Sequence, residues 1–118
     1  MSLLQNQFTI FEEMKSKTKH ISRLIREYVS EIEPSAEVIL YGSRARGDEQ
    51  LDSDWDIIIL TSLSPDIESE RKFRHKLYDL ELDTGESFSV FVYSKQNWQN
   101  IQRITPFYRN VTSEGVRI

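Results

Sequence analysis

The sequence predicts an α/β or α+β fold, in which helices pack around a small sheet. Three short, apolar and β-prone runs, at residues 37–41, 54–61 and 88–93, alternate with segments of helical character. The chain has 118 residues and contains no repeat, low-complexity stretch or linker. We therefore expect a single domain spanning residues 1–118.

The first half of the chain is expected to form one long helix and two strands. Residues 2–32 place apolar side chains close to a helical period, and Pro34 terminates the pattern. Residues 37–41 form a strand, followed by a turn and a short helical segment at 43–47. The next strand, 54–61, is apolar beyond its first three residues, which indicates a central, buried position.

A second long helix is expected after this strand. Ser64, Pro65 and Asp66 have the composition of a helix start, with a serine cap, proline in the first position and an acid in the first turn. The helix should end near Asp83, with Gly85 as its stop.

The remaining elements are a strand and two short helices. Along 88–93 the even-numbered residues are apolar and should face one way, while the odd-numbered residues face the other. Ser94 is expected to cap a short helix. Thr105 and Pro106 should start a final helix, which Gly115 closes.

Composition excludes several classes of protein. The chain has 15 basic and 19 acidic residues, a net charge of −4, so binding of nucleic acid across a broad face is disfavoured. It has no cysteine, which excludes disulfides and thiolate metal sites. No run suggests a membrane span or a secretory signal, so we expect a cytoplasmic location. The lysines at 15, 17 and 19 are expected on a solvated helix face, with phosphate contact as the alternative.

The stretch 42–56 carries the most specific chemical pattern. Gly42 follows a strand and permits a tight turn with close backbone approach to a ligand. Ser43 can then begin a helical turn, whose free N–H groups and hydroxyl attract phosphate. Arg44 and Arg46 could reach phosphate oxygens with their guanidinium groups. This half of the stretch is therefore a candidate nucleotide-binding turn.

Two aspartates complete the pattern. Asp54 and Asp56 lie two residues apart at the start of a strand, so both carboxylates should leave the same face, and Trp55 should face away from them. Paired carboxylates together with substrate phosphates suit Mg²⁺ or Mn²⁺. A calcium loop is excluded because it needs glycine where Ile57 stands and glutamate where Leu63 stands.

Gly42-Ser43, ten residues, then Asp54-x-Asp56, resembles the signature of the DNA polymerase β-like nucleotidyltransferase superfamily. The small size and the Gly-Ser-Arg-Ala-Arg-Gly form at 42–47 are similar to its minimal nucleotidyltransferase branch. The resemblance implies a mixed sheet flanked by helices. It also implies Mg-dependent transfer of a nucleoside monophosphate from a nucleoside triphosphate, with AMP from ATP as the expected case, to a hydroxyl of a protein or small molecule. Gly42 and Ser43 would then hold the triphosphate, and Asp54 and Asp56 the metal.

One expected feature of that family is missing. Active members carry a third carboxylate on the next strand, where strand parity places Ser87 and Ser89 in this chain. Glu86 is the nearest acid and a tentative third metal ligand, although it shares the parity of apolar Phe88. Three alternatives remain: Glu86 turns toward the metal site, the substrate supplies the base, or activity is weak or lost.

The alternative function is a catalytically inactive, antitoxin-like module. Minimal nucleotidyltransferases resemble one half of a pair whose other half is a helical protein, so a helical partner is expected in that case. The sequence leaves the acceptor, the base preference and homo-oligomerisation open.

Overall fold

The computed structural model describes residues 3–63 and 66–118, with side chains from residue 15 onward. Its elements, in chain order, are α1 (Leu3–Ile32), β1 (Glu37–Tyr41), α2 (Ser43–Arg46), β2 (Trp55–Thr61), α3 (Ile67–Thr84), β3 (Phe88–Ser94), α4 (Lys95–Asn100), the 3-10 helix η1 (Gln102–Ile104), α5 (Pro106–Glu114) and β4 (Val116–Arg117).

The sheet is mixed and has the strand order β3-β2-β1-β4. Strand β1 runs antiparallel to both β2 and β4, whereas β2 and β3 are parallel. The parallel pair needs a crossover connection, which α3 provides. The predicted α+β class, with helices flanking a small sheet, is confirmed.

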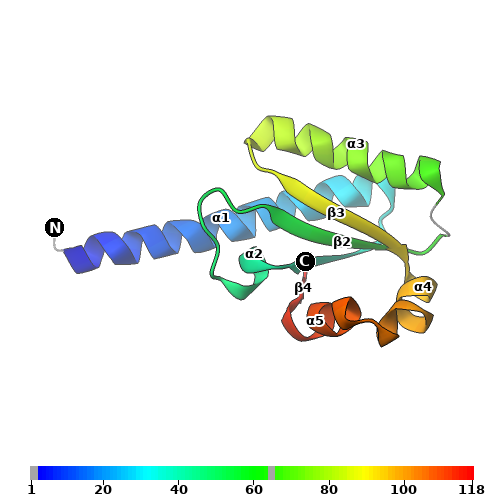
Figure 1. The fold of residues 1–118 in the computed structure, drawn as a ribbon. Helices are drawn as coiled ribbons and strands as arrows, with labels where there is room; N and C mark the ends of the chain where they lie inside the picture. Colours follow the sequence, from blue (N-terminus) through cyan, green and yellow to red (C-terminus); the bar gives the residue numbers. More distant parts are fainter. Residues whose placement is uncertain (1–2, 64–65) are drawn as a thin grey trace.

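Helices cover both faces of the sheet (Figure 1). The apolar stripe of α1 and that of α3 pack on one face, over Trp55, Ile57 and Ile59 of β2. Helices α4 and α5 pack on the other face, over Ile58 and Leu60. Because β2 is buried on both faces, its sequence is a nearly continuous apolar run.

Side-chain caps and a glycine set the ends of the helices after β2. The start of α3 lies later than predicted: Asp66, expected in the first turn, is the N-cap and accepts a hydrogen bond from Ser69 N–H, so the helix begins at Ile67. Ser64 and Pro65, expected as cap and first position, lie outside the described residues. Gly85 ends α3 in the left-handed conformation (φ 75°), as predicted. The predicted caps at Ser94 and Thr105 are confirmed.

Two elements were not predicted. The 3-10 helix η1 joins α4 to α5, and β4 adds a fourth strand beside β1. Strand β4 has only two residues, and its pairing of Val116 with Leu40 is a contact between distant parts of the chain. So short a segment has no periodicity of its own from which a strand could be predicted.

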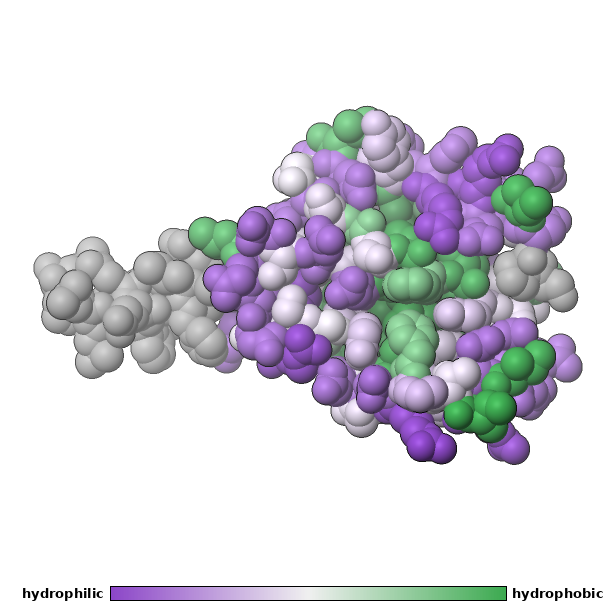
Figure 2. Space-filling view, in the orientation of Figure 1, coloured by the Kyte–Doolittle hydropathy of each residue, from purple (hydrophilic) through white to green (hydrophobic). Residues whose placement is uncertain are grey.

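The surface is mostly polar, with apolar side chains visible between α3 and α5 and beside α4 (Figure 2). Exposed apolar residues include Phe91 of β3, and Ile101 and Ile104 at either end of η1. Among the helices in the described ranges, none has the length and apolar character needed to cross a membrane.

Trp98 is expected to hold α4 and α5 to the sheet. Its ring lies at 4.9–5.9 Å, centroid to centroid, from those of Tyr93, Phe107 and Tyr108. We predict that Trp98→Ala lowers the free energy of unfolding by about 3–5 kcal/mol, because it leaves a cavity among these rings. Ile104→Ala removes an aliphatic group that is 75% exposed and should change stability by less than about 0.5 kcal/mol. Chemical denaturation of both variants checks this, and equal effects would contradict it.

Candidate functional site

The chain turns sharply at Gly42, between β1 and α2. Gly42 has φ 76° and ψ −156°, a backbone region that side-chain-bearing residues avoid. Its carbonyl accepts the N–H groups of Ala45 and Arg46, which begins α2, and Gly47 ends that helix at φ 85°. The N–H groups of Ser43 and Arg44 therefore precede the first hydrogen bonds of the helical turn.

Gly42 lies directly against the carboxylate of Asp56. A Cβ atom at residue 42 would stand 2.2 Å from Asp56 Oδ2, a distance that no side chain tolerates. The antiparallel register causes this closeness, since it pairs Tyr41, the last residue of β1, with Asp56. The sheet thus brings together the glycine turn and the carboxylate that the sequence placed fourteen residues apart.

The two aspartates interact electrostatically at the start of β2. Asp56 is half-buried on the strand, and Asp54 is exposed just before it. Burial raises the pKa of Asp56 above its ordinary value; the charge of Asp54 raises it further, and the charge of Arg46 partly opposes the rise. The residues present therefore form a site with an excess of negative charge, which a hard divalent cation would neutralise.

On the neighbouring strand, the residue beside Asp56 is a serine. The parallel register pairs Asp56 with Ser89 of β3, so the two side chains share one face of the sheet. This is the face that the strand-parity argument gave to Ser89. In the part of the chain that the structure describes, no three Asp, Glu, His or Cys side chains come together in a way that could hold a metal ion. A cation here would have two protein carboxylates and would complete its coordination with substrate and water.

Glu86 lies on the opposite face of the sheet from this pair. It accepts a hydrogen bond from Trp55 Nε1 at 3.2 Å and forms an ion pair with Lys17 Nζ at 2.5 Å. Burial alone would raise the pKa of Glu86, but the hydrogen bonds from Lys17 and Trp55, with the charges of Lys17 and Arg44, hold it below its ordinary value. Glu86, the tentative third metal ligand, is thus occupied on the face that Trp55 shares with α1 and α3.

Arg44 also points to that side. It is 4% exposed, and its guanidinium carbon lies 4.4 Å from the centroid of the Trp55 ring. It donates hydrogen bonds to the carbonyls of Leu51 and Ser53, in the loop that leads to Asp54. These contacts give Arg44 a positioning role: it holds the loop in which Asp54 stands.

Arg46, in contrast, remains near the carboxylate pair. It is exposed and forms ion pairs with Asp48 and with Glu114 of α5, both at 3.2 Å. Exposed pairs of this kind contribute little to stability, at most about 1 kcal/mol, so the guanidinium can exchange them for an anionic ligand. Of the two arginines that the sequence singled out, the structure leaves Arg46 available on the side of Asp56.

The network behind the site includes residues that the sequence did not point to. Lys17, expected on a solvated helix face, has a side chain that is 37% exposed and forms an ion pair with Glu86. Leu51 and Ser53 contribute only backbone carbonyls. The sequence offered one indication of this network, the alternation of Trp55 with two aspartates. That alternation places a large ring on the opposite face of the strand from the carboxylates.

Comparison with known proteins gives a consistent result. A family described as "Nucleotidyltransferase domain" matches residues 22–113. A crystal structure described as a toxin-antitoxin with AMP-PNP superposes with a TM-score of 0.60 at 15% identity, covering 81% of this chain and 70% of that one. A second, of a mutant of the toxin-antitoxin MntA-HpeT, gives a TM-score of 0.52 at 15% identity, covering 85% and 70%. No curated protein matches in sequence. At this identity the structural likeness establishes the fold alone.

The two glycines that flank α2 allow a matched test of the contact with Asp56. Gly47→Ala strains a left-handed backbone but meets open space, so it should cost about 1–2 kcal/mol of stability. Gly42→Ala also forces the Asp56 carboxylate to move, and should cost about 3 kcal/mol or more. Thermal unfolding of both variants measures the difference; an equal or smaller effect at residue 42 would refute the contact.

The pKa of Asp56 predicts a pH effect in metal-free protein. The folded state binds this proton more tightly than the unfolded state, so Asp56 stabilises the fold at acidic pH and loses that contribution as pH rises through its folded pKa. Asp56→Asn should therefore be more stable than the wild type at pH 7, and the advantage should shrink as pH falls toward 4. Denaturation in EDTA at several pH values tests this; a variant less stable at pH 7 would contradict it.

Proposed function

The chain belongs to the nucleotidyltransferase domain family, and from this we propose that it transfers a nucleoside monophosphate to a hydroxyl. The donor is a nucleoside triphosphate, with ATP as the first case, and the acceptor is a hydroxyl of a protein or small molecule. Mg²⁺ or Mn²⁺ is the expected metal. The observation that carries the proposal is the packing of the Gly42 turn against the Asp56 carboxylate, with Asp54 beside it.

In this proposal the turn binds the triphosphate. Gly42 has no side chain between the backbone and the carboxylate pair, so phosphate oxygens can approach both. The N–H groups of Ser43 and Arg44 and the Ser43 hydroxyl are the donors. Arg46 supplies a guanidinium once it leaves Asp48 and Glu114.

Asp54 and Asp56 would hold the metal. When bound, the metal neutralises charge on the triphosphate and favours departure of pyrophosphate. The attacking hydroxyl oxygen bonds to the α-phosphorus as the bond to the pyrophosphate oxygen breaks. No carboxylate stands at Ser89 to take the hydroxyl proton, so in this chain an oxygen of the substrate phosphates is the proposed acceptor.

Ser89, which stands where a third carboxylate is expected, supports a second candidate function, that of a binding module. A chain without the third carboxylate could keep the nucleotide site and act by binding a partner, in the manner of an antitoxin. Two solved structures of similar fold are described as toxin-antitoxin proteins, which supports this interpretation. A helical partner protein is the expected partner in that case.

A transfer assay distinguishes the two candidates. With α-labelled ATP, Mg²⁺ and a panel of hydroxyl acceptors, the wild type should transfer label, and Asp54→Asn or Asp56→Asn should reduce transfer by about 100-fold or more. Ser89→Asp should increase transfer, because it places a proton acceptor beside Asp56.

Gln96→Asp is the control for added charge, since it lies on α4, beyond the other end of β3. If neither the wild type nor Ser89→Asp transfers label or binds AMP-PNP, the transferase proposal fails. Nucleotide binding without transfer by either protein would favour the binding module.

A further inference from the structure

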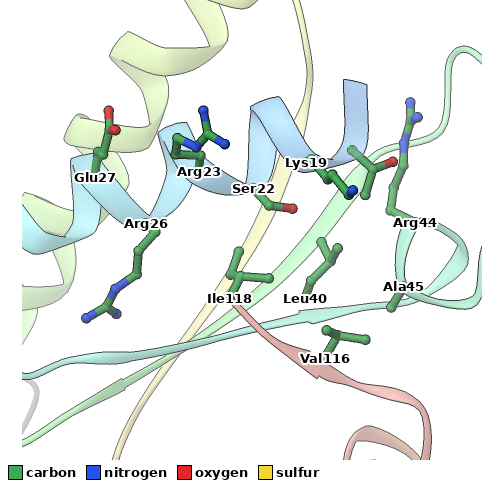
Figure 3. A pocket seen from close by; sticks show the side chains of 11 residues that line it. Lys19, Ser22, Arg23, Arg26, Glu27, Leu40, Arg44, Ala45, Val116 and Ile118 are labelled. Atoms are coloured by element: carbon green, nitrogen blue, oxygen red, sulfur yellow. The ribbon is translucent and has the colours of Figure 1, made fainter. Parts of the chain in front are cut away.

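A hollow lies between α1 and the β1–β4 edge of the sheet, on the face away from Asp56. It has a volume of about 540 Å³. Its floor is aliphatic, formed by Leu40, Ala45, Val116 and Ile118 below α1 (Figure 3). Leu40 and Val116 are paired across the two strands and therefore share this face. Val116 is 47% exposed, so the floor is open to solvent at the sheet edge.

A second hollow, of about 570 Å³, continues from the first. The two share Thr18, Lys19 and Arg44, and the second extends to Arg46 and Glu49. Over the side chains that the structure describes, they follow α1 from residue 15 to residue 27 and form one trough, here called the α1 trough. At a rise of 1.5 Å per residue this described part is about 18 Å long, enough for about three turns of a bound helix.

The α1 trough is basic, although the chain is acidic. Counting described side chains only, six basic and two acidic residues line the two hollows, whereas the whole chain has 15 basic and 19 acidic residues. Arg26 and Arg44 are engaged with backbone carbonyls. Lys19 and Arg23 are exposed on α1 and have no hydrogen bond or ion pair with any side chain in the described part of the chain. These two cations are therefore available to an anionic partner.

We propose that the α1 trough is a docking surface for an acidic amphipathic helix of a partner protein. The apolar face of such a helix would cover Val116 and Ile118, and its acidic edge would meet Lys19 and Arg23. Among the described side chains, the lining contains no aromatic ring on which a base could stack, and its floor is aliphatic, which favours a protein over a nucleic acid.

The position of the trough bears on the proposed transfer without depending on it. Leu40 faces α1, whereas Asp56 shares the other face of the sheet with Ile58. Arg46, whose charge acts on Asp56, lines the far end of the trough. A partner helix bound in the trough would leave Asp54 and Asp56 uncovered. One end of that helix would lie near Arg46, close to the carboxylate pair. Binding should therefore persist in Asp56→Asn, which separates this proposal from the transferase proposal.

Selection of peptides from a random library tests the docking surface directly. A displayed library of random 16-residue peptides is selected on the wild-type chain, and individual binders are measured by fluorescence anisotropy. We expect binders that are acidic and amphipathic, with affinity that falls as salt rises. Lys19→Glu/Arg23→Glu and, separately, Val116→Asp should each weaken binding about tenfold or more, with unfolding temperature and transfer activity unchanged.

Matched controls change the same groups elsewhere. Arg71→Glu/Lys72→Glu reverses two exposed cations on α3, and Ile104→Asp alters an exposed aliphatic residue beside α5. Both should retain full binding. Selected peptides that are not acidic, or that bind all variants equally, would overturn the proposal. Binding of an oligouridylate that the trough variants abolish would also overturn the proposal. The same holds if the chain forms a dimer that Val116→Asp dissociates.

Discussion

The carboxylate of Asp56 occupies the space that a side chain at residue 42 would need. The β1–β2 register sets this contact by pairing Tyr41 with Asp56. A slip of one residue would turn Asp56 into the core under α1 and α3 and would expose Trp55, so burial of that ring fixes the register. This pairing places the Gly42 turn and helix α2 beside the two aspartates. The position of the site is therefore a consequence of sheet packing.

The opposite face of β2 holds the second half of the arrangement. Trp55 lies between Arg44, which stacks on its ring, and Glu86, which accepts its N–H. Arg44 also binds the loop carbonyls before Asp54, and Lys17 ties Glu86 to α1. The charges of this network are paired within the protein, which is the condition for burying them without a large penalty. The negative charge at Asp54 and Asp56 is offset only in part, by Arg46, and remains available for a cation.

Much of the fold could be predicted from sequence because its signals are local. The strands at β1, β2 and β3 have apolar runs of strand length, and the caps at Ser94, Thr105 and Gly85 act on their own helix ends. Strand parity also predicted the face of Ser89. The burial of Arg44, the engagement of Glu86 by Lys17 and the two-residue strand β4 depend on tertiary contacts, which spacing does not reveal. The hydrogen bonds of Arg44 to the loop carbonyls give it a positioning role that the sequence did not indicate, and its phosphate contact stays a prediction.

We propose that the Gly42 turn and the Asp54–Asp56 pair together form one nucleotide and metal site. A crystal structure of the chain with AMP-PNP and Mn²⁺, with the manganese located by its anomalous scattering, would show where both ligands bind. We predict an anomalous peak bound by the Asp54 and Asp56 carboxylates, with the triphosphate against the Gly42 and Ser43 backbone. A peak at Glu86, or a triphosphate bound away from the Gly42 turn, would contradict it.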